Sequence, residues 1–600
     1  MVGDKGLLSR VFGSEDYVRL VEREIAATSK LVPSLASDVR RAGGLRTVYF
    51  GGGTPSLLDP PLLKCLMNAL REQCGGLAAG CEVTLEMDPG TFDEARLDAY
   101  LKDCGVNRVS LGVQSWDAGT LTAAGRAHTV ADAENAVRLL AAAHDDWRAR
   151  SAQGGGGGYK PGLRTWSLDL ISGLPTQPRR PARGGGLGSA GAVTGTDSRA
   201  DTGANAGPDT AGNDEQSAVD TAAVVSWDAT LARTVAWARP PHVSAYDLQL
   251  EPGTAFGRWY LSQSKALPSL GPKAAASGRG GKARASERSA GCGLPSEACA
   301  AELYRMASRA LAAAGYEHYE VSSFARLSKG QTQGPAGNEE QPKEGPSAPN
   351  PGTVAMASSP SVLGQAAAGS SPHRSRHNAA YWALSPFLGV GLGATSMLRP
   401  GRRAVRPRTM AAYRDDWVGP LERAAEQAAG TEAPGHKAGE VATVAAAGCD
   451  ASGRRAWAVS GRRVGLGMLF GTLSAPRVGD GGGDGTGGES VWDGGGDDDG
   501  GASRFELLLE GLMVALRCAD GVDLDAVALR FGPAAADAVE KALLGLCAGG
   551  ATGGAPLAKR VIPFKVGCRG AVRLTDPGGF LFSNTAIGAV FAALDPGMVD

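Results

Sequence analysis

Three consecutive glycines, Gly51, Gly52 and Gly53, follow the β-branched and aromatic run of residues 47–50 and precede Thr54. The run predicts a buried strand, and its sudden end in glycines predicts a loop with almost no side chains. A ligand can approach the backbone N–H and C=O groups of such a loop closely. A tight turn explains the glycines equally well when they are taken alone. The polar residues that follow in the chain bear on that choice.

Four polar residues stand late in the next predicted strands, at Glu86, Gln114, Asp169 and Gln249. Each alone could be a solvated strand end. The carboxyl ends of parallel strands share one rim, however, so in a parallel barrel the four side chains would converge. Placement of Gly52, Glu86, Gln114 and Asp169 on different faces would contradict a shared site.

The elements that would position these residues alternate between strand and helix. Mostly apolar strands, with helices between them, predict βα units and a parallel sheet. The predicted strands end at Phe50 or span residues 82–86, 106–115, 166–175, 242–250 and 316–324. The predicted helices span residues 16–32, 60–71, 93–103, 131–144, 223–238 and 300–314.

Four tracts rich in Gly, Ala, Ser and Pro interrupt this alternation, at about residues 178–221, 264–298, 327–372 and 428–500. They cannot bury enough apolar surface to order themselves, so they are predicted to be disordered insertions. The remaining residues, roughly 400, suffice for one large domain and one small one. Helices at 505–516, 523–531 and 534–547, with a strand at 571–575, predict a small winged-helix-like C-terminal domain.

The composition excludes several classes of protein. The formal net charge of −1 gives no field for nucleic acid or a membrane surface. No apolar run approaches the roughly 20 residues that span a bilayer. The ten cysteines are scattered, and none is spaced C-x-x-C, as expected for reduced thiols inside a cell. Residues 1–15 make a poor signal or transit peptide, so a cytoplasmic location is expected. A mitochondrial or plastid location is the alternative if a transit peptide lies upstream of Met1.

Several motifs fall in one order along the chain and carry a resemblance. They are Phe50-Gly-Gly-Gly-Thr-Pro-Ser56, Glu86-Met-Asp-Pro-Gly90, Asn107-Arg-Val-Ser-Leu-Gly-Val-Gln-Ser115, Gly125-Arg-Ala-His128, Leu168-Asp-Leu-Ile-Ser-Gly-Leu-Pro175, Ser244-Ala-Tyr-Asp-Leu-Gln-Leu-Glu-Pro-Gly-Thr254 and Gly315-Tyr-Glu-His-Tyr-Glu-Val-Ser-Ser-Phe-Ala325. The sequence resembles the radical S-adenosylmethionine (SAM) proteins of the oxygen-independent coproporphyrinogen III oxidase family. Arg376-His-Asn-Ala-Ala-Tyr-Trp382 is similar to the H-N-x-x-Y-W motif of the HemW branch, whose members are described as haem chaperones. The sequence also resembles radical SAM domain-containing protein 1.

The resemblance implies an α/β fold, a partial (β/α)6 TIM-like radical SAM barrel with a small winged-helix-like C-terminal domain. It also implies a SAM site, to which it assigns Gly52, Gly53, Thr54, Glu86, Gln114, Arg126, Asp169 and, more loosely, Gln249. Glu86 would accept hydrogen bonds from the amino or ribose groups of SAM. Arg126 could pair with a carboxylate in a bidentate way. Capping by Asp169 and a surface ion pair of Arg126 are the structural alternatives.

Haem is the second ligand that the resemblance implies. Imidazole is a common axial ligand of haem iron, so His377 is the candidate ligand, with Asn378, Tyr381 and Trp382 as porphyrin contacts. The alternative is a structural histidine held in a packed aromatic cluster. Downstream arginines could meet porphyrin propionates, although a solvated basic loop is the simpler account. They are Arg402, Arg403, Arg406 and Arg408.

The motif that defines the family, C-x-x-x-C-x-x-C, is absent from the chain. In the family its three thiolates hold a [4Fe–4S] cluster, in the loop before the helix that matches residues 17–31. We expect that the first strand and this loop belong to an upstream segment, because SAM-contacting residues would have little use without a cluster. A chain that lacks the cluster altogether is the alternative.

We accordingly divide the chain into six segments. They are a non-matching N-terminus (1–15), a partial barrel with two insertions (16–326), an insertion (327–372), a connection with the H-N-x-x-Y-W motif (373–427), a Gly/Asp-rich insertion (428–500) and a HemN-type C-terminal domain (503–600).

The first functional hypothesis is a haem chaperone with haem-accepting client proteins as partners. The second is oxygen-independent oxidation of coproporphyrinogen III, and the third is a cluster-less, non-catalytic remnant.

Overall fold

A computed structural model describes most of the chain. The described residues are 14–32, 34–153, 161–176, 208–250, 257, 293–328, 370–399, 401–430, 442–449, 455–461, 503–547, 556–561 and 569–599. The expected non-matching N-terminus lies almost wholly outside them.

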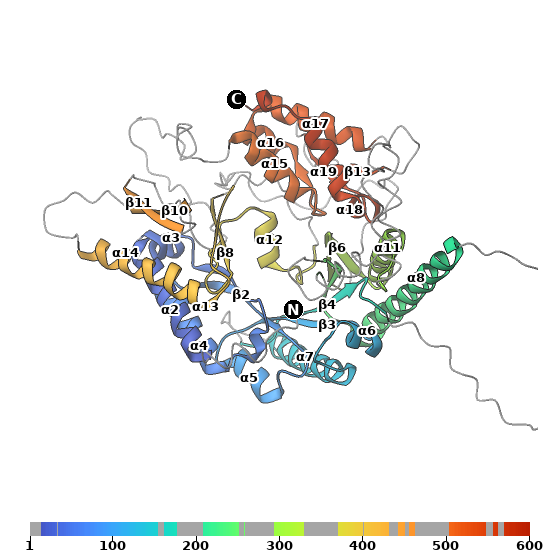
Figure 1. Ribbon diagram of the computed structural model, residues 1–600, viewed down its shortest axis with the longest axis horizontal. Coiled ribbons are helices and arrows are strands. Elements are labelled where there is room, and N and C mark those ends of the chain that lie inside the picture. Colours follow the sequence, from blue (N-terminus) through green and yellow to red (C-terminus); the bar gives the residue numbers. More distant parts are fainter. Residues whose placement is uncertain are drawn as a thin grey trace, which may run out of the picture.

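The larger domain is built on a curved seven-stranded sheet in the order β1-β2-β3-β4-β5-β7-β6 (Figure 1). The first five strands pair in parallel. They are β1 (Leu45–Phe50), β2 (Leu77–Met87), β3 (Arg108–Gln114), β4 (Thr165–Ser172) and β5 (His242–Asp247). The predicted α/β partial barrel is therefore confirmed.

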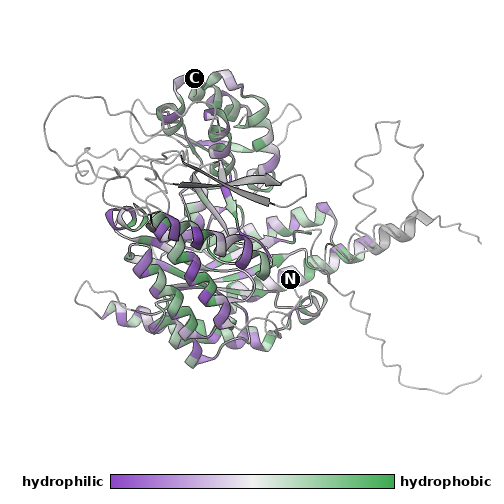
Figure 2. Cartoon of the chain, turned by 60° about the vertical axis from the view of Figure 1, so that its left-hand side comes forward, coloured by the Kyte–Doolittle hydropathy of each residue, from purple (hydrophilic) through white to green (hydrophobic). Residues whose placement is uncertain are grey.

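Helices cover the convex side of the sheet, as Figure 1 shows. They are α2 (Ser14–Leu31), α3 (Ser34–Arg41), α4 (Pro60–Gln73), α5 (Glu94–Lys102), α6 (Ala118–Ala123), α7 (Val130–Ala152), α8 (Pro208–Arg233) and α11 (Glu297–Ala313). Their apolar faces and the outward residues of the strands, such as Leu85, Leu111 and Leu168, form one core. Hydrophilic and hydrophobic faces alternate around these helices in Figure 2.

The concave side of the sheet is polar, although the strands were expected to be mostly apolar. Every second residue turns a polar side chain inward, as in Glu82, Thr84 and Glu86 of β2 and in Thr165, Ser167 and Asp169 of β4. Alternation with period two is typical of strands with two different faces. This face is therefore the place where the fold gathers its polar groups.

The last predicted strand is a hairpin. Residues 316–324 were expected to close the parallel series, but β6 (Tyr316–Glu320) turns back into β7 (Ser323–Arg326), and β7 pairs antiparallel with both β5 and β6. The short turn between the two strands brings β7 into the position beside β5 that a single strand would have taken.

Two of the predicted disordered insertions contain regular structure. Helix α8 begins at Pro208, within the tract expected at 178–221, and a two-stranded antiparallel sheet of β10 (Ala442–Cys449) and β11 (Arg455–Gly461) lies within the tract at 428–500. These elements correct the prediction for those residues, since Gly- and Ala-rich composition did not prevent backbone pairing. The tracts at 264–298 and 327–372 lie mostly outside the described residues.

The chain after these elements packs back onto the barrel through one buried carboxylate. Glu24 of α2 is fully buried and accepts hydrogen bonds from Arg406 Nε at 2.9 Å, Trp417 Nε1 at 2.8 Å and the Gly391 N–H at 2.8 Å. The solvated basic loop expected around Arg406 is therefore wrong for that residue, which is 4% exposed. A buried carboxylate requires such partners because isolated charges are costly to bury.

The C-terminal domain has its own core, formed by α15 (Arg504–Ala515), α16 (Leu524–Phe531), α17 (Pro533–Cys547), α18 (Gly578–Leu581) and α19 (Ser583–Ala592). A three-stranded sheet in the order β12-β14-β13 completes it, with strands β12 (Val522–Asp523), β13 (Ala558–Val561) and β14 (Ala571–Leu574). The predicted helical, winged-helix-like domain is confirmed.

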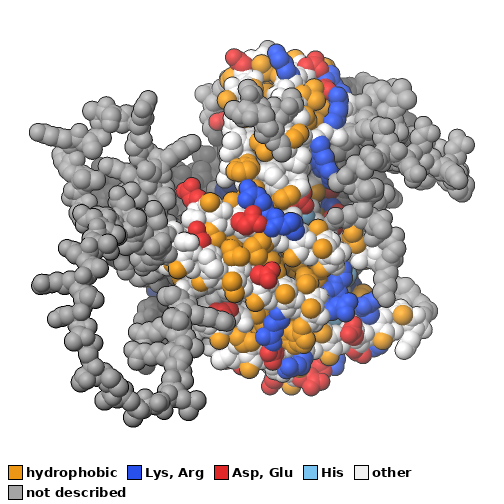
Figure 3. All heavy atoms as spheres, turned by 90° about the vertical axis from the view of Figure 1, so that its right-hand side faces the viewer, with side chains coloured by type: hydrophobic (Ala, Val, Ile, Leu, Met, Phe, Trp, Pro, Cys, Tyr) orange, Lys and Arg blue, Asp and Glu red, His pale blue; other side chains and the backbone are white. Residues whose placement is uncertain are grey.

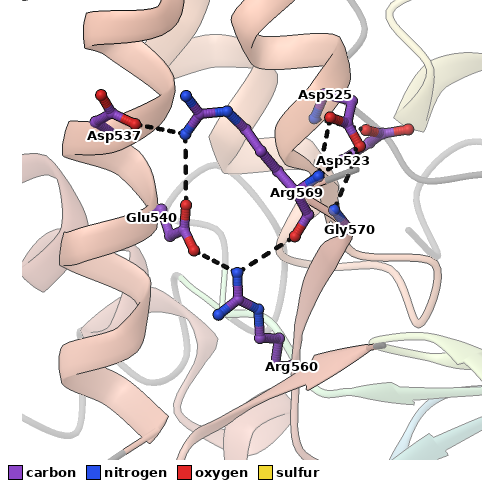
Figure 4. Close-up of polar contacts among 7 residues, drawn as sticks. All are labelled: Asp523, Asp525, Asp537, Glu540, Arg560, Arg569 and Gly570. Carbon is purple, nitrogen blue, oxygen red and sulfur yellow. Dashed lines mark hydrogen bonds and ion pairs between the residues drawn. The ribbon is translucent and has the colours of Figure 1, made fainter. Parts of the chain in front are cut away.

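Exposed ion pairs tie the small sheet of this domain to its helices (Figure 4). Arg569 bonds to Asp537 of α17, Arg560 bonds to Glu540, and the Arg569 N–H donates to Asp525 at 3.0 Å. Exposed pairs of this kind add little stability each, so the core holds the domain together.

The domain contacts the barrel through a half-buried ion triplet, in which Arg374 bonds to Glu317 and to Asp520. Seen from the α8 side, the surface intersperses charges of both signs with apolar side chains (Figure 3). Among the described helices, none is both long and apolar enough for a bilayer crossing.

Candidate functional site

The glycine loop begins where β1 ends and is held against β2. The Gly52 N–H donates to Glu86 Oε2 at 2.9 Å, and the Tyr49 hydroxyl donates to Glu86 Oε1 at 2.7 Å. Gly52 and Gly53 have φ values of 82° and 62°, which L side chains rarely adopt. Among the described residues, no heavy atom outside the glycine and its chain neighbours lies within 4 Å of the place a Cβ would take at either glycine. The loop is therefore open to a ligand on that side.

Asp88, two residues beyond Glu86, joins three loops at the carboxyl ends of the strands. It accepts hydrogen bonds from Thr54 Oγ1 at 3.2 Å and from Arg126 Nη2 at 2.8 Å. Its own N–H donates to Ser56 Oγ at 3.2 Å. The arrangement fixes Arg126 over the rim, where a ligand carboxylate could share the guanidinium.

Gln114 adopts an unusual backbone conformation at the end of β3. Its φ is 68°, and the pairing of β3 with β4 shifts register between Gly112 and Gln114. A Cβ on Gly112 would lie 2.8 Å from Gln114 Nε2 and 3.0 Å from Asp88 Oδ1. A side chain at position 112 would therefore collide with both the Gln114 amide and the Asp88 carboxylate. Strained backbone at a strand end is typical of functional sites.

Asp169 lies on the concave face among serine hydroxyls. Ser110 Oγ donates to Oδ2 at 2.6 Å and Ser167 Oγ donates to Oδ1 at 2.9 Å. Burial raises the pKa of Asp169, the serine hydroxyls lower it in part, and the charge of Glu86 raises it further. Burial raises the pKa of Tyr49, and the charges of Glu86 and Asp169 raise it further. Glu86, Asp169 and Tyr49 thus share one electrostatic environment.

These contacts bring most of the predicted SAM residues to one edge of the sheet. We call this edge the carboxyl-end rim, formed by Gly52, Gly53, Thr54, Glu86, Asp88, Gln114, Arg126 and Asp169. Gln249 lies two residues beyond β5 and is exposed, and no hydrogen bond joins it to these residues in the described structure. The rim is acidic and rich in donors, which suits a ligand with ammonium and hydroxyl groups.

Several of these polar residues were absent from the prediction. Asp88 lay within a quoted motif but was given no role, although it anchors both Thr54 and Arg126. Tyr49, Ser110 and Ser167 were also missed. The period-two polar pattern of the strands was the signal that could have found them.

The H-N-x-x-Y-W segment forms α12 (Arg376–Trp382), which sits on the concave face beside β1 and β2. Ser375 caps the helix by accepting from the Asn378 N–H at 3.2 Å. Glu82 of β2 accepts the N–H groups of Arg376 at 3.1 Å and His377 at 2.9 Å. A carboxylate at a helix N-terminus is favourable.

The imidazole of His377 is held between two tyrosines. Nδ1 lies 3.0 Å from Thr47 Oγ1 and Nε2 lies 2.8 Å from the Tyr381 hydroxyl, and the ring stacks on Tyr49 with centroids 4.7 Å apart. Burial lowers the pKa of His377 to about 4, so the ring is neutral at physiological pH. The Tyr381 side is the more open, because Tyr381 is 40% exposed.

The described cysteines do not offer a cluster site. Cys74, Cys81 and Cys104 are buried in the barrel core, and burial raises the pKa of each thiol, to about 12 for the first two and to about 11 for Cys104. Within the described ranges no group of three or more His, Cys, Asp or Glu side chains could hold a metal ion. These residues therefore do not fit a [4Fe–4S] cluster.

Comparison with known proteins agrees with this architecture. The Radical SAM superfamily model matches residues 24–146, and the HemN C-terminal domain model matches residues 502–549. The heme chaperone HemW of Synechocystis sp. is 30% identical over 398 residues, which cover 66% of this chain and 61% of that protein. This chain is similar to HemW-type radical SAM proteins.

Two further proteins are similar to this chain. An oxygen-independent coproporphyrinogen III oxidase of Paracoccus denitrificans is 32% identical over 171 residues, 28% of this chain and 33% of that protein. The solved coproporphyrinogen III oxidase (HemN) of Escherichia coli aligns with a TM-score of 0.47 and 16% identity, covering 97% of this chain and 84% of the other. The predicted family is confirmed, and the chain spans about three fifths of the length of its HemW relative.

Proposed function

We propose that this chain is a haem chaperone that binds SAM at the carboxyl-end rim and haem at α12, and that it passes haem to client proteins. The observation that carries the SAM assignment is the open glycine loop bonded to Glu86. In this proposal Gly52 and Gly53 accept close approach of the amino acid part of SAM, because no side chain occupies that space.

Each charged residue of the rim contacts a different group of SAM in this proposal. Glu86 accepts hydrogen bonds from the SAM ammonium, and Arg126 forms an ion pair with the SAM carboxylate. Asp169 accepts a hydrogen bond from a ribose hydroxyl of SAM. The family implies a [4Fe–4S] cluster, which when bound supplies the electron that cleaves SAM. No step of the proposal passes through the cluster, because the described cysteines do not fit one.

Titration calorimetry with SAM tests the rim. Glu86→Gln should weaken SAM binding by roughly 30-fold or more, since a charge-assisted hydrogen bond contributes about 2 kcal/mol or more. Glu94→Gln, an exposed change on α5, is the matched control and should leave the affinity unchanged. Equal affinity for SAM in both variants would contradict the assignment.

The geometry around His377 supports an axial ligand role. Nδ1 can donate to Thr47 Oγ1, as ligating histidines commonly bond their second nitrogen to an oxygen. Nε2 then faces the exposed hydroxyl of Tyr381, which haem iron could replace. A neutral ring needs no deprotonation to bind iron.

Hemin titration followed at the Soret band tests this ligand. His377→Ala should remove the band of the specific complex. Tyr381→Phe should bind hemin at least as tightly as the wild type, because it removes the hydroxyl that competes for Nε2. Retention of the band in His377→Ala, with unfolding curves equal to those of the wild type, would exclude His377 as the ligand.

Oxygen-independent oxidation of coproporphyrinogen III is the second candidate, favoured by the Paracoccus relative that carries this name. An anaerobic assay with reductant, SAM and coproporphyrinogen III separates the two functions. Formation of protoporphyrinogen by the chain would favour the oxidase, and haem transfer to an apoprotein without it would favour the chaperone.

A further inference from the structure

A second concave region lies at the opposite ends of the strands. It is a hollow of about 1450 Å³, lined by residues at the amino ends of β2 to β6, the ends of α7 and α11, and the beginning of α12. We call it the amino-end hollow. Pockets for small ligands usually measure about 300–1,000 Å³, so it has room for a large one.

The charged residues of the hollow are mostly basic. Five arginines line it against two carboxylates, Glu82 and Asp145. The arginines are Arg148, Arg164, Arg239, Arg326 and Arg376. Glu82 already accepts the N–H groups of Arg376 and His377, so both of its oxygens have a donor from α12.

Four of these arginines form no ion pair within the described part of the chain. Arg376 donates to the Gly80 carbonyl at 2.8 Å, and Arg326 donates to the Tyr316 hydroxyl at 2.6 Å. Neither these two nor Arg148 or Arg239 forms an ion pair there. His373 lines the same hollow. Burial, His144 and the positive charges of nearby arginines lower the pKa of His373 to about 4.

Aromatic side chains form much of the remaining wall. Trp147, Trp237 and Tyr316 line the hollow together with small apolar residues of α11. The indole N–H of Trp147 is buried and has no hydrogen-bond acceptor among the described residues. A buried donor without an acceptor is costly, so a ligand oxygen that satisfied it would gain affinity.

We propose that the amino-end hollow binds an aromatic polyanion, a flat ring system that carries two or more carboxylate or phosphate groups. Guanidinium groups match both kinds of anion in a bidentate way, and indole rings offer faces for stacking. The inference goes beyond the proposed function, because it concerns the other edge of the sheet and requires neither SAM nor His377. Haem, with its propionates, and ATP, with its phosphates, are the two sources of this chemistry that we would test.

The experiment uses calorimetric titration of the full chain at low salt with ATP in the absence of metal, and absorbance titration with hemin. At least one probe should bind at one site per chain, and Arg148→Gln/Arg376→Gln should weaken it at least 30-fold. Trp147→Phe should weaken the same probe a few-fold, because it removes the unpaired N–H. Arg414→Gln, an exposed change beside Asp415, is the control and should not alter binding.

The outcomes separate this site from the others. Binding of ATP alone identifies a phosphate ligand, and binding of hemin alone identifies a carboxylate ligand. Hemin binding that is lost in His377→Ala but unchanged in the arginine variant would count against the hollow as a hemin site. The proposal is overturned if neither probe binds, or if the double variant, folded by circular dichroism, binds as tightly as Arg414→Gln.

Discussion

The two edges of one sheet differ in sign and in how their charges are paired. At the carboxyl-end rim, Glu86, Asp88 and Asp169 are all engaged by donors from the protein. At the amino-end hollow, arginines such as Arg148 and Arg376 meet only neutral oxygens or no described partner. The rim is thus pre-organised by internal bonds, whereas the hollow has basic groups available to an anion.

Part of this difference follows from the fold. In βα units the helix N-termini lie near the carboxyl ends of the strands, and helix C-termini lie near the amino ends. Cations are favoured at helix C-termini, which accounts for arginines near the ends of α7 and of the π-helical turn Thr234–Ala238 that follows α8. The helix dipoles explain why basic side chains gather at the amino ends of the strands and acidic ones at the carboxyl ends. The size of the hollow and its aromatic wall are the separate argument for a ligand.

The largest effect that would test the difference between the rim and the hollow is expected from alanine substitutions at two glycines. Gly52 and Gly43 have φ values of 82° and 87°, and both would place a Cβ in open space. Alanine at either should cost roughly 1–2 kcal/mol in unfolding free energy, because both positions are left-handed. Only Gly52→Ala, at the rim, should also lower SAM affinity, by about tenfold or more in calorimetry.

Equal losses of SAM affinity in Gly52→Ala and Gly43→Ala would mean that backbone strain alone governs binding. Chemical denaturation of both variants provides the check that their stabilities fall together.

Asp169→Asn should separate stability from binding at the rim. The folded-state pKa of Asp169 is raised, so ionisation costs native stability as pH rises above the pKa of the unfolded chain. Asparagine removes this cost, and the variant should be more stable than the wild type by on the order of 1 kcal/mol at pH 8, with the gain vanishing near pH 3. SAM affinity should fall several-fold, since a charged acceptor becomes neutral.

Urea unfolding at the two pH values measures the first effect, and calorimetry measures the second. A variant less stable than the wild type at pH 8 would show that the serine hydrogen bonds outweigh the cost of burying the charge.

The smallest expected effect concerns salt. Raising ionic strength from about 50 to about 300 mM should weaken a polyanion at the amino-end hollow about fivefold, because several like charges are screened together. SAM carries a small net charge and binds at paired groups, so its affinity should change less than twofold. Parallel titrations of both ligands would contradict the comparison if their salt dependences were the same.

Local sequence patterns predicted much of the barrel and of the C-terminal domain. The helix expected at 93–103 corresponds to α5, and Asp93 caps it by accepting a hydrogen bond from the Arg96 N–H at 2.8 Å. The glycine loop and the positions of Glu86, Gln114 and Asp169 followed from strand ends. Such features depend on residues within a few positions of one another, where periodicity and turn chemistry act.

Local sequence patterns could not predict which residues far apart in the chain bond to one another. His377 bonds to Thr47 across 330 residues, and Arg406 bonds to Glu24 across 382. The position of β7 beside β5 and the arginines of the hollow likewise come together only in the folded chain.

The sequence by itself therefore determined the order of strands and helices, the glycine loop and the separate C-terminal domain. The tertiary structure decided which face of the sheet is polar, which histidine nitrogen faces which hydroxyl, and where the arginines of the amino-end hollow gather. The physical reason is range: helix and strand patterns arise from neighbours along the chain, whereas burial and charge pairing depend on contacts between residues far apart in sequence.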